Sequence, residues 1–503
     1  MADANPPDIA TIFVPPPDAV IETHISRVFL SGDRAWKLKK AVSFPYVDFS
    51  GLDQRHEACR REVELNRRTA PDLYLGVRAV RRDRAGKLSL DGAGDPVDWL
   101  VEMRRFDPEQ TFDRLLARDA LTAGMVEALA GVVASFHETA EPVPVSAEAA
   151  LAEALAVNDL AFFRLPPDSL PAGMLQDYRE RMAAELARLS PVLAGRHAAG
   201  HIRHGHGDLH LRNIAMIDGH PVLFDCLEFD DRLATCDTLY DIAFLLMDLL
   251  AHDRRDLASR ALNRYLDITG DYDGLPLLPP YIALRAAIRC HIAALQPEGR
   301  AEARRYLALA CACLRPAAAR LLAVGGLSGS GKSTVARGIA PAIAGACGAV
   351  ILRSDVIRKQ LHGIAVTDRL PAAAYTAEAS ARTYARLGAL ARRLLAAGCP
   401  VILDAVFGRE EERSAAATLA AEAGVGFTGL WLKAPEAVLT GRIAARQNDA
   451  SDATADVVRW QAQTLEPPAG WRRIDAAGSI EATVTAALQA LPPGWRQPVT
   501  PVQ

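Results

Sequence analysis

One eight-residue stretch limits the possible fold of this chain more than any other. Residues Gly326–Ser333 read GLSGSGKS, with a short apolar run, Leu321–Gly325, before them and a helical pattern after them. An apolar strand, a glycine-rich turn and a helix in this order fit the pattern G-x-x-x-x-G-K-[ST] in the context that the pattern requires. Apolar segments then alternate with helical ones, which predicts a parallel sheet with helices on both faces. These segments are Ala349–Arg353, Pro400–Phe407, Phe427–Lys433 and Trp471–Asp475.

The glycines of this stretch, a P-loop, point to phosphate binding. They allow a tight turn that brings successive backbone N–H groups to phosphate oxygens, and the following helix adds its positive N-terminal end. Lys332 would reach the β- and γ-phosphates of ATP, and the hydroxyl of Ser333 would hold Mg²⁺. The predicted nucleotide-binding residues are Gly326, Leu327, Ser328, Gly329, Ser330, Gly331, Lys332, Ser333 and Thr334.

A second signature, HGDLHLRN, lies at His206–Asn213. Asp208 and Asn213 have the spacing H-x-D-x-x-x-x-N of a phosphotransferase catalytic loop, in which the aspartate accepts the substrate's hydroxyl proton and the asparagine binds metal. Asp225 follows the apolar segment PVLF and matches a second metal-binding aspartate. Because the two signatures belong to unrelated folds, we predict two ATP-dependent units in one chain.

Length and composition are consistent with this prediction. The chain has 503 residues, too many for one ordinary core, and half of them are hydrophobic. A net charge of −4 favours neither nucleic acid nor an acidic membrane as a partner. The eight cysteines include no C-x-x-C pair, which favours reduced thiols over disulfides or a zinc site. No signal peptide is apparent and no apolar run reaches the about 18 residues that a membrane span needs, so we predict a cytoplasmic protein.

The hydrophobic patterns predict three parts. A Pro-rich, loosely ordered lead-in covers residues 1–24, an α+β two-lobed domain covers 25–318, and an α/β P-loop domain covers 319–503. The small lobe extends to about residue 105 and combines short strands with one helix over Gln54–Arg68. Helical periodicity dominates from there to about Ala318, except in the polar region His201–Asp231 that holds the second signature.

The spelling HGDLH…N resembles the aminoglycoside phosphotransferase and choline kinase group over roughly residues 25–315. The resemblance implies a protein-kinase-like two-lobed fold that uses ATP and Mg²⁺. It implies that Asp208 is the catalytic base, that Asn213 and Asp225 are metal ligands, and that His206 shapes the loop. The neighbouring acids Asp237 and Asp241 are interpreted as structural residues at a helix entry.

The same resemblance implies a lysine on a small-lobe strand that binds the ATP phosphates. RAWK at Arg34–Lys37 makes Lys37 the first candidate, and Lys39 on the same strand face is the alternative. Glu62 or Glu64 of the predicted helix would hold the lysine, and we favour Glu62.

Residues 320–492 resemble the small P-loop kinases of the gluconate kinase, shikimate kinase and chloramphenicol phosphotransferase type, above all the zeta-toxin-like branch. The motifs are ILRSDVIRK, VILDAVF, RIAARQNDASDA and WRRIDA. The resemblance implies that Asp355 and Arg358 bind and activate the acceptor hydroxyl and that Asp404 orients Mg²⁺ or the acceptor. It implies that Arg442 and Arg446 belong to a lid over the transferring phosphoryl group. Three alternatives stay open: Asp355 as a helix cap, Asp404 as a structural strand end, and the arginines as an exposed helix face.

We therefore predict a bifunctional kinase that transfers the γ-phosphoryl group of ATP, with Mg²⁺, to hydroxyls of small molecules. In one alternative, one half is a nucleotide-binding regulatory module. In another, the C-terminal half is a nucleotide or polynucleotide-end kinase. Antibiotic inactivation is a third alternative, which rests on fold analogy alone. No spacing in the sequence reports the acceptors or the oligomeric state.

Overall fold

The computed structural model describes residues 9–23, 25–44, 47–445 and 450–496. Their contacts divide the chain into two compact units. The first comprises Met1–Ala154 and Gly200–Asp241, and the second comprises Leu155–Ala199 and Ile242–Gln503. Over the described ranges, no helix combines the length and the apolar character needed to cross a membrane.

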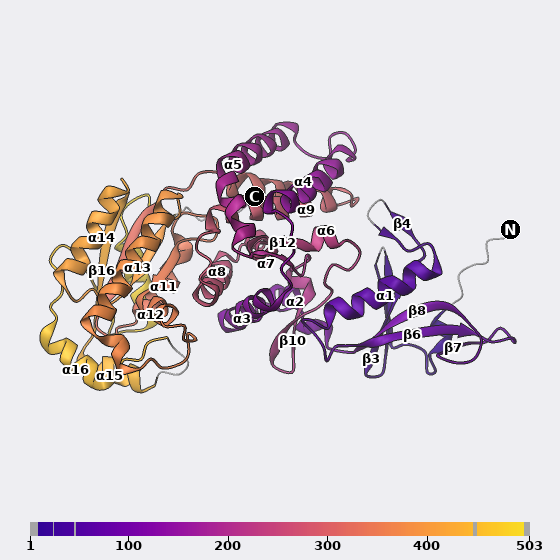
Figure 1. The fold of residues 1–503 in the computed structure, drawn as a ribbon, viewed down its shortest axis with the longest axis horizontal. Coiled ribbons are helices and arrows are strands. Elements are labelled where there is room, and N and C mark those ends of the chain that lie inside the picture. Colours follow the sequence, from indigo (N-terminus) through magenta and orange to yellow (C-terminus); the bar gives the residue numbers. More distant parts are fainter. Residues whose placement is uncertain (1–8, 24, 45–46, 446–449, 497–503) are drawn as a thin grey trace. The chain divides into compact units, whose positions relative to one another are not determined.

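The first unit contains an antiparallel sheet of six strands in the order β1-β2-β3-β8-β6-β7 (Figure 1). Helix α1 (Leu52–Asn66) packs on β8 and β6, where Cys59 and Val63 meet Tyr74 and Val101 in a common core. The strands are β1 (Ala19–Glu22), β2 (Ser26–Ser31), β3 (Arg34–Lys39), β6 (Tyr74–Arg82), β7 (Leu88–Leu90) and β8 (Asp95–Arg104), with a separate hairpin of β4 (Ser43–Phe44) and β5 (Val47–Asp48). The predicted combination of short strands with one helix is confirmed.

Residues 9–22 are ordered parts of this unit, so the expectation of a loose lead-in is wrong for them. A short 3₁₀ helix covers Ile9–Ile12, and β1 pairs with β2. Ile9 and Phe13 are buried against Phe29 and Leu38, on the sheet face opposite α1. Full burial of one such side chain stabilises by about 1.5–3 kcal/mol, which is enough to hold a short segment on the sheet in spite of its prolines.

The second signature lies in a loop next to a tight hairpin of the first unit. Strands β10 (Ile214–Ile217) and β11 (His220–Leu223) are antiparallel, and the two residues between them, Asp218 and Gly219, have φ of 52° and 82°. Positive φ at both positions is typical of the two-residue turns that join twisted strands. The hairpin begins directly after Asn213 and ends just before Asp225, and Phe224 N donates to Asn213 O, so the chain returns towards Asn213 at Asp225. The remaining elements here are α2 (Phe112–Ala117), α3 (Ala123–Thr139), β9 (Ile202–His204), α6 (Asp231–Ala234) and β12 (Thr235–Asp237).

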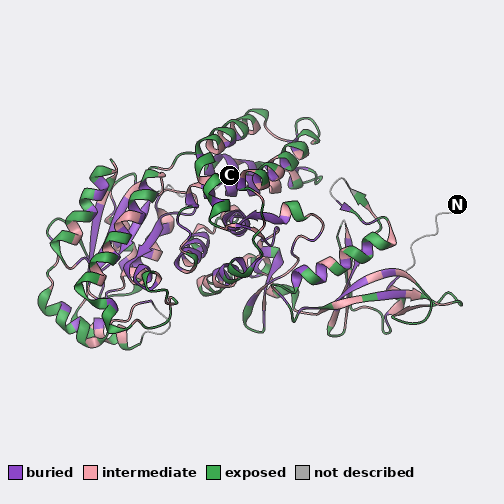
Figure 2. Ribbon diagram, viewed as in Figure 1, coloured by how far each residue is buried: buried purple, intermediate pink, exposed green. Residues whose placement is uncertain are grey.

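The second unit contains a parallel sheet of five strands in the order β14-β15-β13-β16-β17. Figure 2 shows these strands buried between helices whose outer faces are exposed. The strands are β13 (Arg320–Gly326), β14 (Val350–Arg353), β15 (Val401–Asp404), β16 (Gly426–Lys433) and β17 (Arg472–Asp475), which confirms the predicted β-α-β alternation.

Two pairs of helices cover this sheet. Helices α11 (Lys332–Ile339) and α17 (Ile480–Gln489) pack together on one face, where Val335 and Ile339 meet Leu322 and Leu430 in the core. Helices α13 (Ala377–Ala396) and α14 (Glu410–Glu422) also contact each other and the strands. The other helices here are α12 (Ser354–Leu361), α15 (Glu436–Ala444) and α16 (Ala455–Thr464).

Helices that precede residue 318 belong to the same compact unit as the parallel sheet. They are α5 (Ala172–Ala198), α8 (Arg255–Thr269), α9 (Leu278–Ala294) and α10 (Arg300–Cys313), with α4 (Ala147–Phe163) and α7 (Thr238–Ala251) spanning the two units. Asn263 of α8 bonds directly to strand β14: its Nδ2 donates to Ala349 O at 3.2 Å, and Ile351 N donates to its Oδ1 at 2.7 Å. The domain boundary at residues 318/319, which separates the two predicted kinase activities, stays a prediction.

Candidate phosphotransfer sites

The loop Gly326–Ser333 joins β13 to α11, as the sequence predicts, and all nine predicted nucleotide-binding residues lie in the loop or in the first turn of α11. Gly326 and Gly329 have φ of 141° and 83°, values that favour glycine. A Cβ at either position would come within 2.6 Å of a backbone carbonyl oxygen, that of Leu432 or of Leu439. The loop therefore needs glycine at these two positions, because its backbone lies directly against neighbouring chain segments.

Side chains hold the loop in this shape. Lys332 Nζ donates to Leu327 O at 3.0 Å, and Ser328 N donates to Oε1 of the buried Gln461 at 2.8 Å. The Ser330 hydroxyl is buried and has no hydrogen-bond partner among the described residues. An orphaned polar atom inside a glycine-rich cradle fits a loop built to surround phosphate oxygens.

Ser333 and Asp404 meet at the carboxyl edge of the sheet. Strand β15 ends at Asp404 and lies beside β13 in parallel register, so the two residues reach the same edge. Ser333 Oγ donates to Asp404 Oδ2 at 2.6 Å. A hydroxyl and a carboxylate oxygen are ligands that Mg²⁺ prefers, and Mg²⁺ completes its shell with phosphate oxygens and water. These two side chains fit the predicted metal site.

Asp355 lies in the first turn of α12 and is not its N-cap, a position that Arg353 occupies. Burial raises the pKa of Asp355, the charge of Asp404 adds to the rise, and Arg353 and Lys332 oppose it. The carboxyl of Asp355 thus lies close enough to the P-loop lysine and to the candidate metal ligand to interact with both. Its place at the sheet edge fits the predicted acceptor side, while its role stays a prediction.

The predicted lid is described only in part. Arg442 belongs to α15, and its Nη2 donates to Gly478 O at 3.2 Å. A Cβ at Gly331 would lie 4.0 Å from Arg442 Nη1, which places this guanidinium beside the P-loop. Arg446 lies outside the described residues. Arg358 is buried, donates to Ala374 O at 2.7 Å and stacks on a tyrosine ring, so its described contacts are those of a brace.

In the first unit, two lysines of β3 share one carboxylate of α1. Lys37 Nζ lies 2.8 Å from Glu62 Oε1, and Lys39 Nζ lies 2.5 Å from Glu62 Oε2. Lys37 also reaches Asp225 Oδ1 at 2.6 Å, whereas Lys39 pairs with the buried Glu228. Glu64, the alternative partner in the sequence, instead bonds Arg60 in solvent. Lys37 is therefore the lysine that faces the candidate metal ligand, and Lys39 braces the lobe from inside.

The charges of this cluster depend on one another. Burial opposes the charge of Lys37, but Asp225 and Glu62 hold its pKa well above the ordinary value. Burial likewise opposes the charge of Glu62, yet Lys37 and Lys39 hold its pKa at about 2. Burial raises the pKa of Glu228, and the charge of Lys39 limits this rise. Glu228 is not predicted as a site residue from the sequence, although FDCLEF places it three residues after Asp225.

Asp208 and Asn213 contact each other as the catalytic-loop spacing predicts. Asn213 Nδ2 donates to Asp208 Oδ2 at 2.8 Å and to Asp208 O at 3.0 Å. The hairpin returns the chain to this loop just before Asp225, because Phe224 N donates to Asn213 O at 3.0 Å. Asp225 itself has a φ of 61°, and its N–H donates to Tyr74 Oη at 3.1 Å.

Asp241 holds this loop in place, in addition to the structural role at a helix entry that the sequence predicts for it. The residue is fully buried in the first turn of α7. It accepts hydrogen bonds from His206 N at 2.6 Å and from Gly207 N at 3.0 Å, and His137 Nε2 lies 3.2 Å away. The sequence offered one sign of this role, an acid directly before the apolar run IAFLL near the start of a helix. Within the described ranges, no three His, Cys, Asp or Glu side chains converge as metal ligands.

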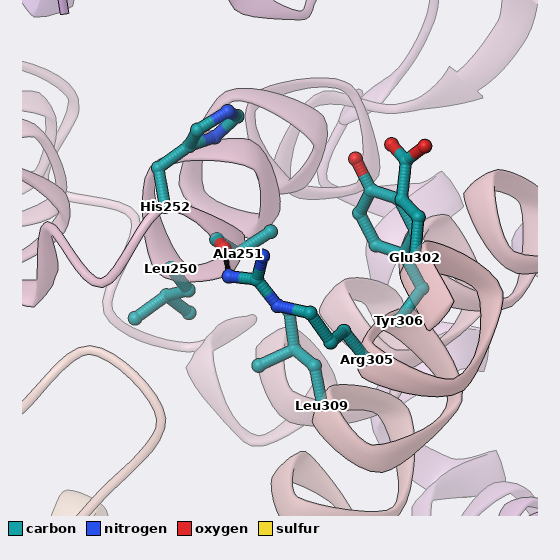
Figure 3. Close-up of a pocket in the computed structure, with 7 residues that line it drawn as sticks. All are labelled: Leu250, Ala251, His252, Glu302, Arg305, Tyr306 and Leu309. Carbon is teal, nitrogen blue, oxygen red and sulfur yellow. Dashed lines mark hydrogen bonds between the residues drawn. The ribbon is translucent and has the colours of Figure 1, made fainter. Parts of the chain in front are cut away.

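A cavity of about 250 Å³ lies elsewhere in the second unit (Figure 3). It is lined by Leu250, Ala251, His252, Glu302, Arg305, Tyr306 and Leu309. None of the predicted site residues borders it, and Arg305 Nη2 already donates to Ala251 O at 3.1 Å. The phosphotransfer chemistry predicted from the sequence has no connection with this cavity.

Residues 321–468 match the protein family described as AAA domain. Among solved structures, a gluconokinase from Sinorhizobium meliloti 1021 is 27% identical, covering 35% of this chain and 92% of its own, with a TM-score of 0.26. A choline/ethanolamine kinase family protein from Mesorhizobium loti is 14% identical, covering 59% of this chain and 87% of its own, with a TM-score of 0.37.

Similarity over nearly the full length is found in mycobacteria. The uncharacterized protein Rv2004c of Mycobacterium tuberculosis is 35% identical over 496 residues, covering 95% of this chain and 96% of its own. The uncharacterized protein Mb2027c of Mycobacterium bovis is similar to the same extent. The chain belongs to the family of these mycobacterial proteins, and its residues 321–468 form a P-loop domain of the AAA type.

Proposed function

We propose that this protein is an ATP-dependent kinase with two catalytic centres, each of which transfers the γ-phosphoryl group to a hydroxyl of a small molecule. The observation that carries the proposal is the 2.6 Å contact between Ser333 and Asp404 beside the P-loop. It joins a candidate metal site to a phosphate cradle at one edge of a parallel sheet, with Asp355 next to it. Motor ATPases also use P-loops, but the carboxyl of Asp355, close enough to Lys332 and Asp404 to feel both charges, supports the proposal of a base for an acceptor hydroxyl.

In the P-loop centre, Asp355 accepts the acceptor's proton as the hydroxyl attacks the γ-phosphorus, and the bond from that phosphorus to the β–γ bridging oxygen breaks to release ADP. Its raised pKa suits a base that works nearer to neutral pH. Lys332 and Arg442 stabilise the negative charge of the transferring group. Ser333 and Asp404 would hold Mg²⁺, which would supply positive charge to offset that of the phosphate oxygens.

In the second centre, Asp208 is the base and Asn213 orients it through the 2.8 Å hydrogen bond. Lys37 binds the ATP phosphates, and its ion pair with Asp225 keeps both groups in place before the nucleotide arrives. Asn213 and Asp225 would hold Mg²⁺, since amide and carboxylate oxygens are suitable ligands. Asp241 fixes the backbone of the loop.

A screen of metabolite pools for phosphorylated products tests the proposal. We would compare the wild type with Lys332→Ala and Asp208→Ala, and use the exposed residues Lys433→Ala and Glu64→Gln as matched controls. Each active-site variant should lose its own set of products, and neither control should lose any.

The outcomes separate the alternatives. If Asp208→Ala leaves every phosphotransfer intact, the N-terminal half is not an enzyme and a nucleotide-binding regulatory module replaces it in the proposal. If the products that depend on Lys332 are 5′- or 3′-phosphorylated oligonucleotides, the C-terminal half is a polynucleotide-end kinase. Oligonucleotide binding that persists in moderate salt would agree with that result.

A further inference from the structure

Helix α8 contributes to the P-loop site although it precedes the P-loop strand by more than fifty positions in the sequence. Asn263 bonds to the edge strand β14, and Asp267 lies one helical turn further along the same helix face. Asp267 meets Arg353, the last residue of β14. Gln360 of α12 adds a third polar contact, since its Nε2 donates to Asp267 O at 3.2 Å.

Arg353 lies between Asp267 and the two candidate metal ligands. Its Nη1 is 3.3 Å from Asp267 Oδ2, its Nη2 donates to Ser333 Oγ at 3.4 Å, and its Nε is 3.5 Å from Asp404 Oδ2. The side chains of Arg353, Asp267 and Asp404 are each at most 6% exposed. Water therefore screens these charges weakly, and each of them acts on the others.

The balance of charge decides what Asp404 can bind. The guanidinium of Arg353 stays protonated at any relevant pH. If Asp404 were its only acidic partner, the guanidinium would compensate that carboxylate and compete with a cation for it. Asp267 supplies a second carboxylate, so Arg353 is shared between two acids and does not compensate the charge of Asp404 alone.

We propose that Asp267 is a positioning residue of the P-loop centre, which anchors Arg353 and thereby preserves Asp404 as a ligand for Mg²⁺. This inference rests on the proposed function of that centre. It makes α8, a helix that the sequence assigns to the N-terminal kinase domain, a working part of the C-terminal site.

The test measures how binding of a non-hydrolysable ATP analogue to the full-length protein depends on Mg²⁺. In Asp267→Asn, which keeps the shape of the side chain, we expect the half-saturating Mg²⁺ concentration to rise by about tenfold, the effect of one charge coupling of ordinary size. Binding of the analogue in EDTA should stay as in the wild type. The control is Asp256→Asn, an exposed acid of the same helix that pairs with Arg254.

A second variant removes the positive charge of the Arg353–Asp267 pair instead of the negative one. Arg353→Met removes the competing cation, so it should lower the Mg²⁺ requirement, and it should cancel the effect of Asp267→Asn in the double variant. This variant also carries the test if Asp267→Asn does not fold.

Three results would contradict the role of Asp267 or the proposed function of the P-loop centre. If Asp267→Asn lowers thermal stability but keeps the wild-type Mg²⁺ requirement, Asp267 is only a structural brace and the inference fails. An unchanged Mg²⁺ requirement in Arg353→Met also contradicts it. If the wild type does not bind the analogue at any Mg²⁺ concentration, the proposed function of the P-loop centre fails instead.

Discussion

Lys37 and Asp225 are 188 positions apart in the sequence and form an ion pair of 2.6 Å. Lys37 thereby connects the strand of the small lobe to the residue that follows the β10–β11 hairpin. Its near neighbour Lys39 makes a similar pair with Glu62 but lies fully inside the lobe. The two lysines should therefore respond differently to the same substitution.

Lys37→Met should raise the KM for ATP of the N-terminal centre about ten- to a hundredfold, because a charge-assisted hydrogen bond of about 1.5–3 kcal/mol is lost. Its effect on stability should be small, since Glu62 keeps Lys39 and Asp225 is 40% exposed. Lys39→Met should instead lower the free energy of unfolding by about 3–5 kcal/mol, because buried acids lose their partner. Steady-state kinetics and urea denaturation of both variants check this. Equal losses of stability would contradict it.

Asp355→Asn should abolish most phosphotransfer by the P-loop centre, with kcat/KM falling about 10²–10⁴-fold. In the wild type, the rate should fall as the pH drops through the raised pKa of Asp355, since the base must be deprotonated. An acid whose pKa is raised by folding destabilises the protein at pH values above that pKa and has no such effect below the ordinary value near 3.9. The variant should therefore melt at a higher temperature than the wild type at pH 7 and at the same temperature at pH 3. A lower melting temperature at pH 7 would disprove the direction of the shift.

Gly329→Ala should weaken binding of an ATP analogue by more than about tenfold, because the left-handed backbone costs an alanine about 1–2 kcal/mol. The new methyl group would also meet Leu439 O at 2.6 Å. The matched control is Gly388→Ala within α13, where a Cβ meets no atom within 4 Å. The control should bind normally and gain about 0.5–1 kcal/mol of stability. Calorimetric titration of both proteins measures the difference.

Asn263→Ala should destabilise the second unit, since it leaves Ala349 O and Ile351 N without their partner in the buried edge of the sheet. Each unmade hydrogen bond costs about 1–3 kcal/mol. Urea denaturation should show the loss, and the amide hydrogen of Ile351 should exchange faster with solvent. Asp256→Ala, on the exposed side of the same helix, should change stability by no more than about 0.5 kcal/mol. Unchanged exchange at Ile351 would show that α8 does not protect the strand.

Local patterns in the sequence predict much of the two sites. The P-loop is a strand, a turn and a helix in succession, so its geometry follows from a few adjacent residues. Asp225 comes back towards Asn213 because only one short hairpin separates them and Phe224 pairs with Asn213. Asp404 reaches Ser333 because parallel strands end at the same edge of a sheet. In each case the backbone alone brings the residues together.

Side-chain contacts between distant elements are not encoded in such patterns. Alternation puts Lys37 and Lys39 on the same strand face, and only packing shows which one faces Asp225. Asp241, Gln461 and Asp267 each act through hydrogen bonds or ion pairs to residues in other segments, at least 34 positions away in the chain. The ordered structure of residues 9–22 also depends on contacts with distant elements. Two buried apolar side chains, Ile9 and Phe13, outweigh the effect of the prolines around them.

The contact between Asn263 and β14 has a consequence for how the protein is made on the ribosome. Translation proceeds from the N-terminus, so α8 is complete before the residues of β14 leave the exit tunnel. The outer strand of the parallel sheet is thus synthesised with its hydrogen-bonding partner already at hand. Unsatisfied strand edges are where nascent sheets pair wrongly with other chains. A truncated gene that starts at the P-loop domain would yield nascent chains whose sheet lacks this protection, and these chains should aggregate during synthesis.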